Sequence, residues 1–147
     1  MIIRKNTCKL AVVQAAPIMF DKEKSTEKAL RLIEESAAHG AELVVFPELF
    51  IPGYPYGMTF GFTVGSRNPD GRKDWKNYYD NSLLADGEEM QKIVSCARKH
   101  HVYVSIGYSE CDPVTATLYN SNMMISPDGQ TLNHRKLKPT GSERVVW

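Results

Sequence analysis

Residues 41–48, AELVVFPE, decide the fold, because an apolar, β-branched run ends at a proline that is followed at once by a carboxylate. Residues 41–46 have the composition of a buried strand, and Pro47 stops it. Glu48 thus has apolar neighbours in the sequence on both sides, and an unpaired charge in an apolar environment is energetically costly. A carboxylate in this place is expected to have a partner and a function.

A second strand and a helix precede this stretch. KLAVVQA, residues 9–15, is a short apolar run before Pro17 and predicts another buried strand. Residues 21–40 predict a helix with one apolar face, with Asp21 or Ser25 as alternative N-caps and Gly40 as its stop. Strand, crossover helix and strand in this order indicate an α/β fold with parallel strands. Ligands collect at the carboxyl ends of such strands, where Glu48 lies.

The remainder of the chain predicts a long loop, a helix and three further strands. Residues 51–86 are rich in Gly, Pro and aromatic residues and are expected to form a functional loop. Residues 87–100 predict a helix with Asp86 as N-cap and a basic last turn. The strands are expected at residues 102–110, 117–126 and 130–137, the last two joined as a hairpin by Pro127-Asp128-Gly129.

Composition restricts the class of protein. A chain of 147 residues is long enough for one domain with a core, and its net charge of +1 with interleaved signs argues against nucleic acid or anionic lipid as a partner. No apolar run is long enough for a membrane span or a signal peptide, so a cytoplasmic location is expected. Three cysteines fit neither a disulfide framework nor a zinc site, which predicts reduced thiols.

Two charged residues are candidates for catalysis by their context. Glu48 ends one strand, and Lys136 ends the last strand in HRKLKPT. If both strands belong to one sheet, a buried Glu with a raised pKa can act as a base and a nearby Lys can stabilise negative charge. The structural alternatives are that Glu48 caps a helix or pairs with an arginine, and that Lys136 is a solvated residue protecting a sheet edge.

Other chemically capable residues carry weaker signals. Cys8, Cys96 and Cys111 have neither a neighbouring histidine nor a Gly-rich turn that would activate them, which favours structural thiols. The four histidines are scattered, the adjacent pair at a helix end being suited to the helix dipole, and none shows metal-site spacing. Four aromatic residues of the long loop fit either a substrate pocket or packing of the loop itself: Tyr54, Tyr56, Phe60 and Phe62.

Three segments together resemble the nitrilase branch of the carbon-nitrogen hydrolase superfamily. They are KLAVVQAAP near the start, AELVVFPELFIPGYP, and HRKLKPTGSERVVW, in matching order along essentially the whole chain. The resemblance implies an α/β fold, the N-terminal part of a four-layer αββα sandwich. It also implies that residues 1–147 form a single carbon-nitrogen hydrolase domain that is incomplete at its C-terminus.

The resemblance also assigns roles to individual residues. Glu48 matches the general base of the family, Lys136 the lysine that stabilises the tetrahedral intermediate, and Glu143 a supporting glutamate; Tyr54 is the candidate substrate-binding residue. The family's nucleophilic cysteine follows the region matched by ERVVW at a short distance, beyond Trp147, and none of the three cysteines present matches it. The 147-residue chain alone is therefore expected to be inactive.

The function implied is hydrolysis of a nitrile to a carboxylic acid and ammonia, without metal or organic cofactor, in a protein that forms homo-oligomers. An aliphatic amidase or a cyanide-degrading enzyme of the same superfamily is one alternative. The other is a catalytically inactive fragment or interaction module that pairs through exposed sheet surfaces.

Overall fold

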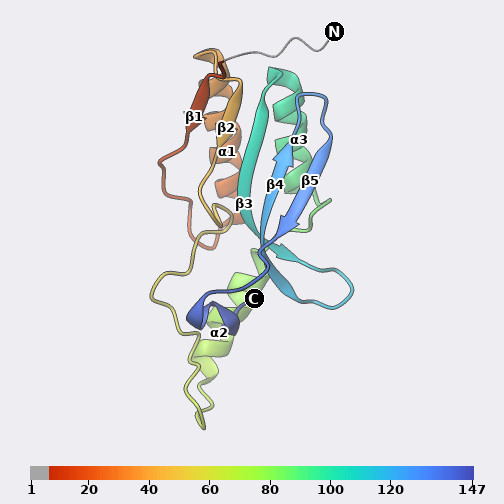
Figure 1. Cartoon of the computed structure of the whole chain (residues 1–147). Coiled ribbons are helices and arrows are strands. Elements are labelled where there is room, and N and C mark those ends of the chain that lie inside the picture. Colours follow the sequence, from red (N-terminus) through yellow and green to blue (C-terminus); the bar gives the residue numbers. More distant parts are fainter. Residues whose placement is uncertain (1–6) are drawn as a thin grey trace.

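The computed structural model describes residues 7–147 and contains one mixed sheet with helices on one of its faces (Figure 1). The strands are β1 (Leu10–Val12), β2 (Leu43–Val45), β3 (Tyr103–Cys111), β4 (Leu118–Ile125) and β5 (Thr131–Arg135). The helices are α1 (Lys22–Ala38), α2 (Pro69–Asp80) and α3 (Glu88–His100), followed by the 3-10 helix η1 (Gly141–Val145).

The sheet combines a parallel and an antiparallel half. Its order is β1-β2-β3-β4-β5, with β1, β2 and β3 parallel and β3, β4 and β5 antiparallel. The predicted strand-helix-strand unit and the predicted hairpin are therefore both confirmed, and the α/β class with them. Gly129, with a φ of 82°, makes the turn between β4 and β5, where Ser126 N–H donates to the Gln130 carbonyl at 2.8 Å.

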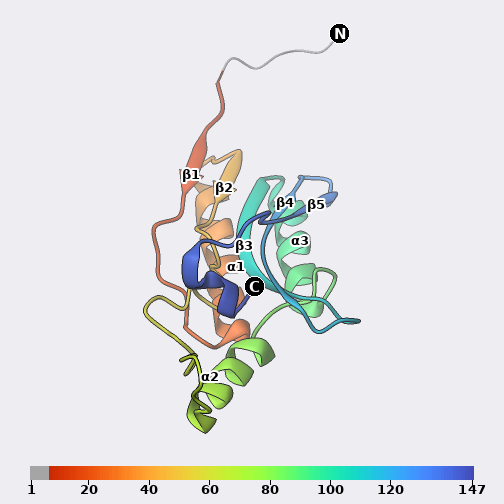
Figure 2. The same cartoon turned by 60° about the horizontal axis from the view of Figure 1, so that its bottom comes forward.

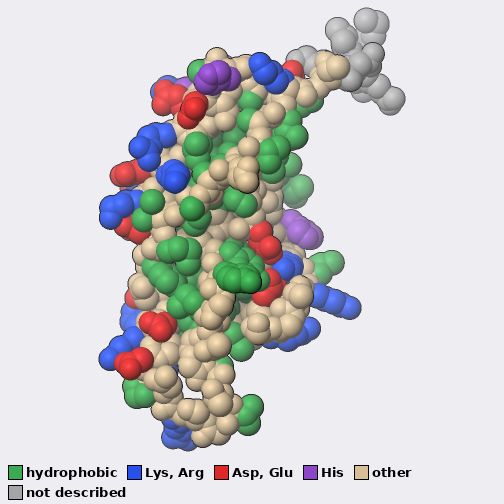
Figure 3. Space-filling model, turned by 90° about the vertical axis from the view of Figure 1, so that its left-hand side faces the viewer, with side chains coloured by type: hydrophobic (Ala, Val, Ile, Leu, Met, Phe, Trp, Pro, Cys, Tyr) green, Lys and Arg blue, Asp and Glu red, His purple; other side chains and the backbone are tan. Residues whose placement is uncertain are grey.

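The two faces of the sheet differ in what covers them. Val44, Val104 and Ile125 are fully buried on the face covered by α1 and α3, which both lie behind the sheet in Figure 1. On the other face, strands that are in register present exposed apolar side chains instead: Leu10 (52% exposed), Val12 (71%), Tyr103 (49%), Met124 (39%) and Leu132 (71%). Figure 3, which views the molecule from the β1 side, shows hydrophobic side chains at the surface along much of its height.

Residues 9–15 correct one prediction. The expected strand forms, but only over Leu10–Val12, and it is an edge strand with one face open rather than a buried strand. Periodicity identifies a strand, whereas its burial depends on whether a second layer covers the sheet. Within residues 7–147 the sheet is therefore covered on one face only, by α1 and α3, whereas α2 and η1 lie beyond its lower end in Figure 1.

A second correction concerns the long loop expected at residues 51–86. This segment contains the 12-residue helix α2, capped by Asn68, whose side chain accepts a hydrogen bond from Asp70 N–H, with Pro69 in the first turn. Proline is well tolerated at the start of a helix, because the first N–H groups of a helix have no intrahelical partner. Pro69 therefore begins this helix instead of breaking it. Gly71 in this helix is buried against the Phe60 carbonyl, so closely that a Cβ would collide with it, which requires glycine at this position.

Of the predicted caps, the structure confirms one and excludes two. Asp21 caps α1, accepting a hydrogen bond from Lys24 N–H at 2.8 Å, whereas Ser25 is buried inside the helix and bonds to Ile18. Gly87, not Asp86, is the N-cap of α3, and no side chain caps that helix. Gly40 follows the C-cap of α1 with a φ of 80°, as its stop signal predicted.

Gly107 on β3 lets the segment that carries Glu48 lie directly on the sheet. A Cβ at Gly107 would come within 2.6 Å of the Leu49 nitrogen and the Pro47 oxygen, and 2.8 Å from Glu48 Cα. All three are backbone atoms, which cannot move away as a flexible side chain could. The position of Glu48 thus depends on the absence of a side chain at Gly107.

We expect Gly107→Ala to lower the free energy of unfolding by at least about 2 kcal/mol, since the added methyl group overpacks backbone against backbone. Urea unfolding of the purified chain measures this. Gly57→Ala is the comparison: its Cβ would meet nothing within 4 Å, so only the positive φ of 76° opposes it, at about 1 kcal/mol. Equal losses for the two variants would contradict the close packing at Gly107.

Candidate active site

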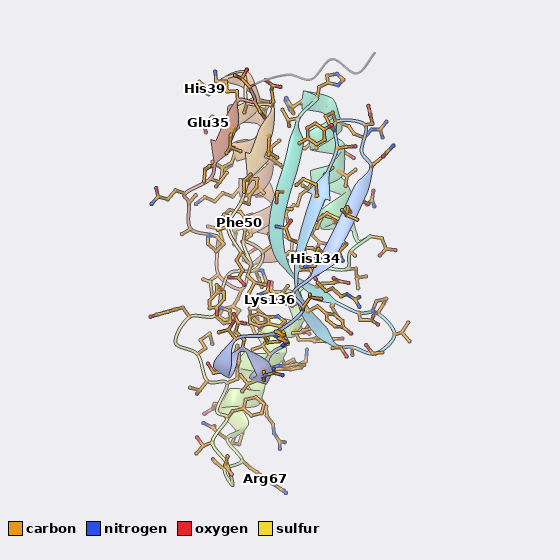
Figure 4. The ribbon with its side chains drawn as sticks, viewed as in Figure 1. Glu35, His39, Phe50, Arg67, His134 and Lys136 are labelled. Carbon is orange, nitrogen blue, oxygen red and sulfur yellow. The ribbon has the colours of Figure 1, made fainter. Side chains whose placement is uncertain are left out.

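Glu48, Lys136 and Glu143 come together at the end of the sheet where β2 ends and where the chain leaves β5 to form η1. Glu48 follows β2, Lys136 is the first residue after β5, and Glu143 is in η1. Figure 4 shows Lys136 at this end of the sheet, and Figure 2 brings the end forward with η1 close to α2. Lys136 contacts Glu48, which is 88 positions away in the sequence, and Glu143, which is 7 positions away. The fold thus brings two distant segments together at this site.

The Lys136 ammonium group lies between the two carboxylates. Its Nζ donates to Glu48 Oε1 at 2.9 Å and to both oxygens of Glu143 at 3.0 Å. The hydrogen bond to Glu48 raises the pKa of Lys136, and the hydrogen bonds to Glu143 raise it further. Partial burial lowers the pKa, but this effect is smaller than that of the two carboxylates together. The ammonium therefore stays charged at neutral pH.

Glu143 is the buried member of the cluster, 8% exposed. Its carboxylate accepts hydrogen bonds from the Thr140 N–H in a capping box, from the Tyr54 hydroxyl at 2.7 Å and from Lys136. Burial alone would raise the pKa of Glu143, but these donors outweigh it and hold the pKa below its ordinary value. The hydrogen bond from the Tyr54 hydroxyl to Glu143 in turn raises the pKa of that hydroxyl.

Glu48 differs from the expectation of a buried carboxylate. Its side chain is 50% exposed within residues 7–147, so it is not the buried carboxylate that the sequence suggested. Instead its charge is matched by two donors on one oxygen: Lys136 Nζ and the side-chain amide of Asn120, whose Nδ2 donates to Oε1 at 2.6 Å. Among the described residues both hydrogen bonds to this carboxylate go to Oε1, and none reaches Oε2.

Asn120 is a site residue that the sequence analysis missed. It lies on β4 and is 6% exposed, and its carbonyl accepts a hydrogen bond from Lys136 N–H at 2.8 Å, which extends the β4–β5 ladder by one residue. Asn120 therefore binds Glu48 by its side chain and Lys136 by its backbone. The three consecutive polar residues in LYNSN were a signal that this strand contacts polar groups, but they do not say which residue Asn120 meets.

A second polar network on β3, β4 and β5 was also missed. Glu110 is buried and accepts hydrogen bonds from Ser121 (2.6 Å), Asn133 (2.8 Å) and Arg135 Nε (3.0 Å). Burial alone would raise the pKa of Glu110, but the Arg135, Ser121 and Asn133 donors lower it below its ordinary value. Because Arg135 directly precedes Lys136, this network holds the end of β5 on the sheet.

The predicted aromatic residues gather around a cavity of about 340 Å³ beside Glu143. Tyr54, Tyr56, Phe60 and Phe62 all line it, together with residues of η1 and Trp147. Helix α2 supports the loop from behind: its Tyr78 is fully buried and donates to the Gly53 carbonyl at 3.2 Å. Trp147 packs against both Tyr54 and Tyr78, with ring centroids 6.1 and 6.0 Å apart.

The hydrogen bonds of the cysteines, of His39 and of His101 do not involve this cluster, whereas His134 lies on β5 two residues before Lys136. Cys8 is exposed before β1, Cys96 contacts the Leu30 carbonyl, and Cys111 is buried near Asp112 and Tyr79. His101 is the C-cap of α3 in a left-handed conformation. His39 bonds to the carbonyl of Glu35, and these two residues are labelled in Figure 4. Within residues 7–147 no group of three potential metal ligands occurs, and no helix is long and apolar enough to cross a membrane.

Comparison with known proteins identifies the family. Residues 9–147 match the carbon-nitrogen hydrolase family, so this chain belongs to it. The chain is 43% identical to an aliphatic nitrilase of Sinorhizobium fredii (strain HH103) over 93% of its own length and 44% of the relative's. It is 45% identical to a cyanide hydratase of Stereum hirsutum (strain FP-91666) over 95% and 36% of the two lengths. The chain thus spans less than half the length of these relatives.

Solved structures agree on the fold. The NitFhit protein of C. elegans superposes with a TM-score of 0.66 at 26% identity, over 88% of this chain and 28% of that one. An N-terminal amidase bound to an Asn-Glu-Ala peptide gives a TM-score of 0.67 at 22% identity, over 95% and 30% of the two chains. The expected nitrilase-like α/β fold is therefore confirmed.

The lowered pKa of Glu143 predicts a pH-dependent contribution to stability. A carboxylate with a depressed folded-state pKa stabilises the protein fully above its unfolded value of 4.5 and loses this effect as pH falls through the folded value. We expect Glu143→Gln to cost about 1–3 kcal/mol at neutral pH, because charge-assisted hydrogen bonds are lost.

Urea unfolding from neutral pH to about pH 3 measures the difference between the native chain and Glu143→Gln, which should shrink as Glu143 becomes protonated. Glu27→Gln, at an exposed position on α1, is the control. A difference that stays constant over this range would show that the charge of Glu143 does not stabilise the fold.

Proposed function

We propose that this chain supplies the base and the lysine of a nitrilase that hydrolyses a nitrile to a carboxylic acid and ammonia. The observation that carries the proposal is the Lys136 ammonium held between Glu48 and Glu143 at 2.9–3.0 Å. Membership of the carbon-nitrogen hydrolase family and 43% identity to an aliphatic nitrilase support it. In this proposal Glu48 and Lys136 act on the reacting atoms, Glu143 supports catalysis by positioning Lys136, and Tyr54 contacts the substrate.

In the first step Glu48 takes the proton of a cysteine thiol and the thiolate adds to the nitrile carbon. The nitrile nitrogen then takes this proton from Glu48, which gives a neutral thioimidate and restores the carboxylate. Oε2 of Glu48 is the oxygen suited to this, because both donors occupy Oε1. Proton transfer from thiol to carboxylate leaves the net charge of the cluster unchanged. The thiolate then lies near Lys136, whose raised pKa keeps it positive and able to stabilise negative charge.

Two water molecules complete the reaction. The first adds to the thioimidate, and expulsion of ammonia leaves a thioester. The second hydrolyses the thioester to the carboxylic acid and restores the thiol, with Glu48 as general base for each water. Glu143 touches the reacting atoms only through Lys136, so in this scheme it fixes the position of the ammonium group.

The nucleophile in this proposal comes from a part of the protein outside these 147 residues. None of the contacts of Cys96 and Cys111 involves Glu48, Lys136 or Glu143, and Cys8 is exposed before β1. The share of the relatives' length that the chain spans, at most 44% for the matches given above, supports this, as does the apolar sheet face left open. Residues 1–147 would then form the N-terminal part of one domain and would not turn over nitriles alone.

Cyanide hydration is the second candidate, supported by the 45% identity to a cyanide hydratase. It uses the same addition of a thiolate to a carbon-nitrogen triple bond, but releases the amide instead of ammonia. An amidase remains an alternative within the family, and an inactive interaction module is the alternative of another class. We further propose a cytoplasmic homo-oligomer that acts on a small-molecule nitrile without a cofactor and binds neither membrane nor nucleic acid.

We expect Glu48→Gln and Lys136→Ala, each made in a longer form of the protein that contains the nucleophile, to lower kcat for ammonia release by at least about a thousandfold. Ammonia production from a panel of nitriles is the measurement. Glu27→Gln and Lys138→Ala are matched controls at exposed positions and should stay near the parent rate. A Glu48 or Lys136 variant that folds normally and retains a tenth of the parent rate would exclude the assigned roles.

A further inference from the structure

The cavity beside Glu143 contains a binding site whose chemistry defines a class of substrate. We propose that it receives an uncharged aromatic substituent of the nitrile, so that aryl and arylalkyl nitriles are the substrates rather than charged nitriles or cyanide. The inference rests on the proposed function for the position of the nitrile group. Its first test does not, because it measures binding to the chain itself.

Two segments that are distant in sequence build the walls of the cavity. One is the loop from Tyr54 to Phe62, and the other is η1 with the residues up to Trp147. Met58, Phe60, Val145 and Trp147 contribute apolar surface, and Phe60 and Val146 are at most 9% exposed. Tyr56 and Phe62, which are 92% and 61% exposed, form the rim. The cavity is thus mainly apolar, with Thr59 and Ser142 as uncharged polar residues in its lining, and its rim is aromatic.

No charge is free to recognise a charged substituent. Glu143 is the one charged residue among those that line the cavity. Its Oε1 is bound by Tyr54 and Lys136, and its Oε2 by Lys136 and Thr140. A carboxylate or an ammonium group entering the cavity would lose its hydration without gaining an ion pair, which is unfavourable. The lining therefore selects for uncharged ligands.

The volume fits a ring rather than a small nitrile. An apolar cavity of about 150 Å³ is enough for benzene, and this one measures about 340 Å³. One ring with a short linker, or two fused rings, would fill it and contact aromatic faces on several sides. Acetonitrile would leave most of the apolar surface unfilled and gain little from it.

The cavity adjoins the catalytic cluster through a shared residue. Glu143 lines the cavity and also binds Lys136 Nζ at 3.0 Å, and Tyr54 lines it while donating to Glu143 at 2.7 Å. A ring in the cavity therefore directs its nitrile group toward Lys136 and Glu48. The Tyr54 hydroxyl is occupied by Glu143, so Tyr54 offers the ring its aromatic face.

The experiment is an NMR titration of the 147-residue chain with three ligands: phenylacetonitrile, acetonitrile and 4-(cyanomethyl)benzoate. The last is phenylacetonitrile with a negatively charged carboxylate on its ring. We expect phenylacetonitrile to shift the Met58, Val145 and Val146 methyl signals and to bind at least about tenfold more tightly than the other two. Shifts confined to other parts of the chain, or equal affinity for the charged and uncharged rings, would overturn the proposal.

Met58→Trp fills the cavity and should weaken phenylacetonitrile binding by about tenfold or more. Val64→Trp is the matched control, because Val64 lies two residues beyond the Tyr54–Phe62 loop, is fully exposed and does not line the cavity. If Met58→Trp does not fold, Phe62→Ala at the exposed rim should still weaken binding. Unchanged affinity in a folded Met58→Trp or Phe62→Ala variant would place the ring elsewhere.

Kinetics in the longer protein separate this inference from the proposed function. Met58→Trp should raise KM for phenylacetonitrile about tenfold while leaving KM for acetonitrile unchanged. Equal effects on both substrates would contradict the cavity as a ring site, although nitrile hydrolysis itself would stand. Ring binding to the chain without hydrolysis of any nitrile would uphold the cavity and contradict the proposed function.

Discussion

The ammonium group of Lys136 between two carboxylates is the interaction on which the site depends. Two negative charges and one positive charge leave an excess of negative charge at the end of the sheet. Neutral groups stabilise this negative charge by donating hydrogen bonds. Asn120 donates to Glu48, and the Tyr54 hydroxyl and the Thr140 N–H donate to Glu143. Each carboxylate is thus bound by both a charged and a neutral donor, which satisfies the charges without burying Glu48.

The rest of the architecture serves to bring these groups to one place. Gly107 allows the Glu48 segment to lie on β3, and the Glu110 and Arg135 network holds β5 up to the residue before Lys136. A capping box orients Glu143 within η1, and α2 supports the Tyr54 loop through the buried Tyr78. Removing any of these supports would leave the residues present but loosen their mutual geometry.

The sequence allowed much of this site to be predicted, because strand ends are readable from apolar runs and prolines. Glu48 and Lys136 were found that way, and the family resemblance added Glu143. Asn120 was missed because a polar residue within a strand does not reveal what lies opposite it. The burial of Glu48 and of β1 was predicted wrongly, since burial depends on neighbouring layers and not on the local pattern. Helix α2 was missed because Pro69 and Gly71 are ordinarily loop residues.

The central claim is that Lys136 pairs with both carboxylates at once, and its own titration tests this most directly. The pH dependence of the Lys136 13Cε signal gives the pKa of its ammonium group in the native chain and in Glu48→Gln and Glu143→Gln. The account predicts a pKa above the ordinary 10.5 that falls in each variant, because each removes one negative partner. A pKa at or below 10.5, unchanged by either substitution, would contradict it.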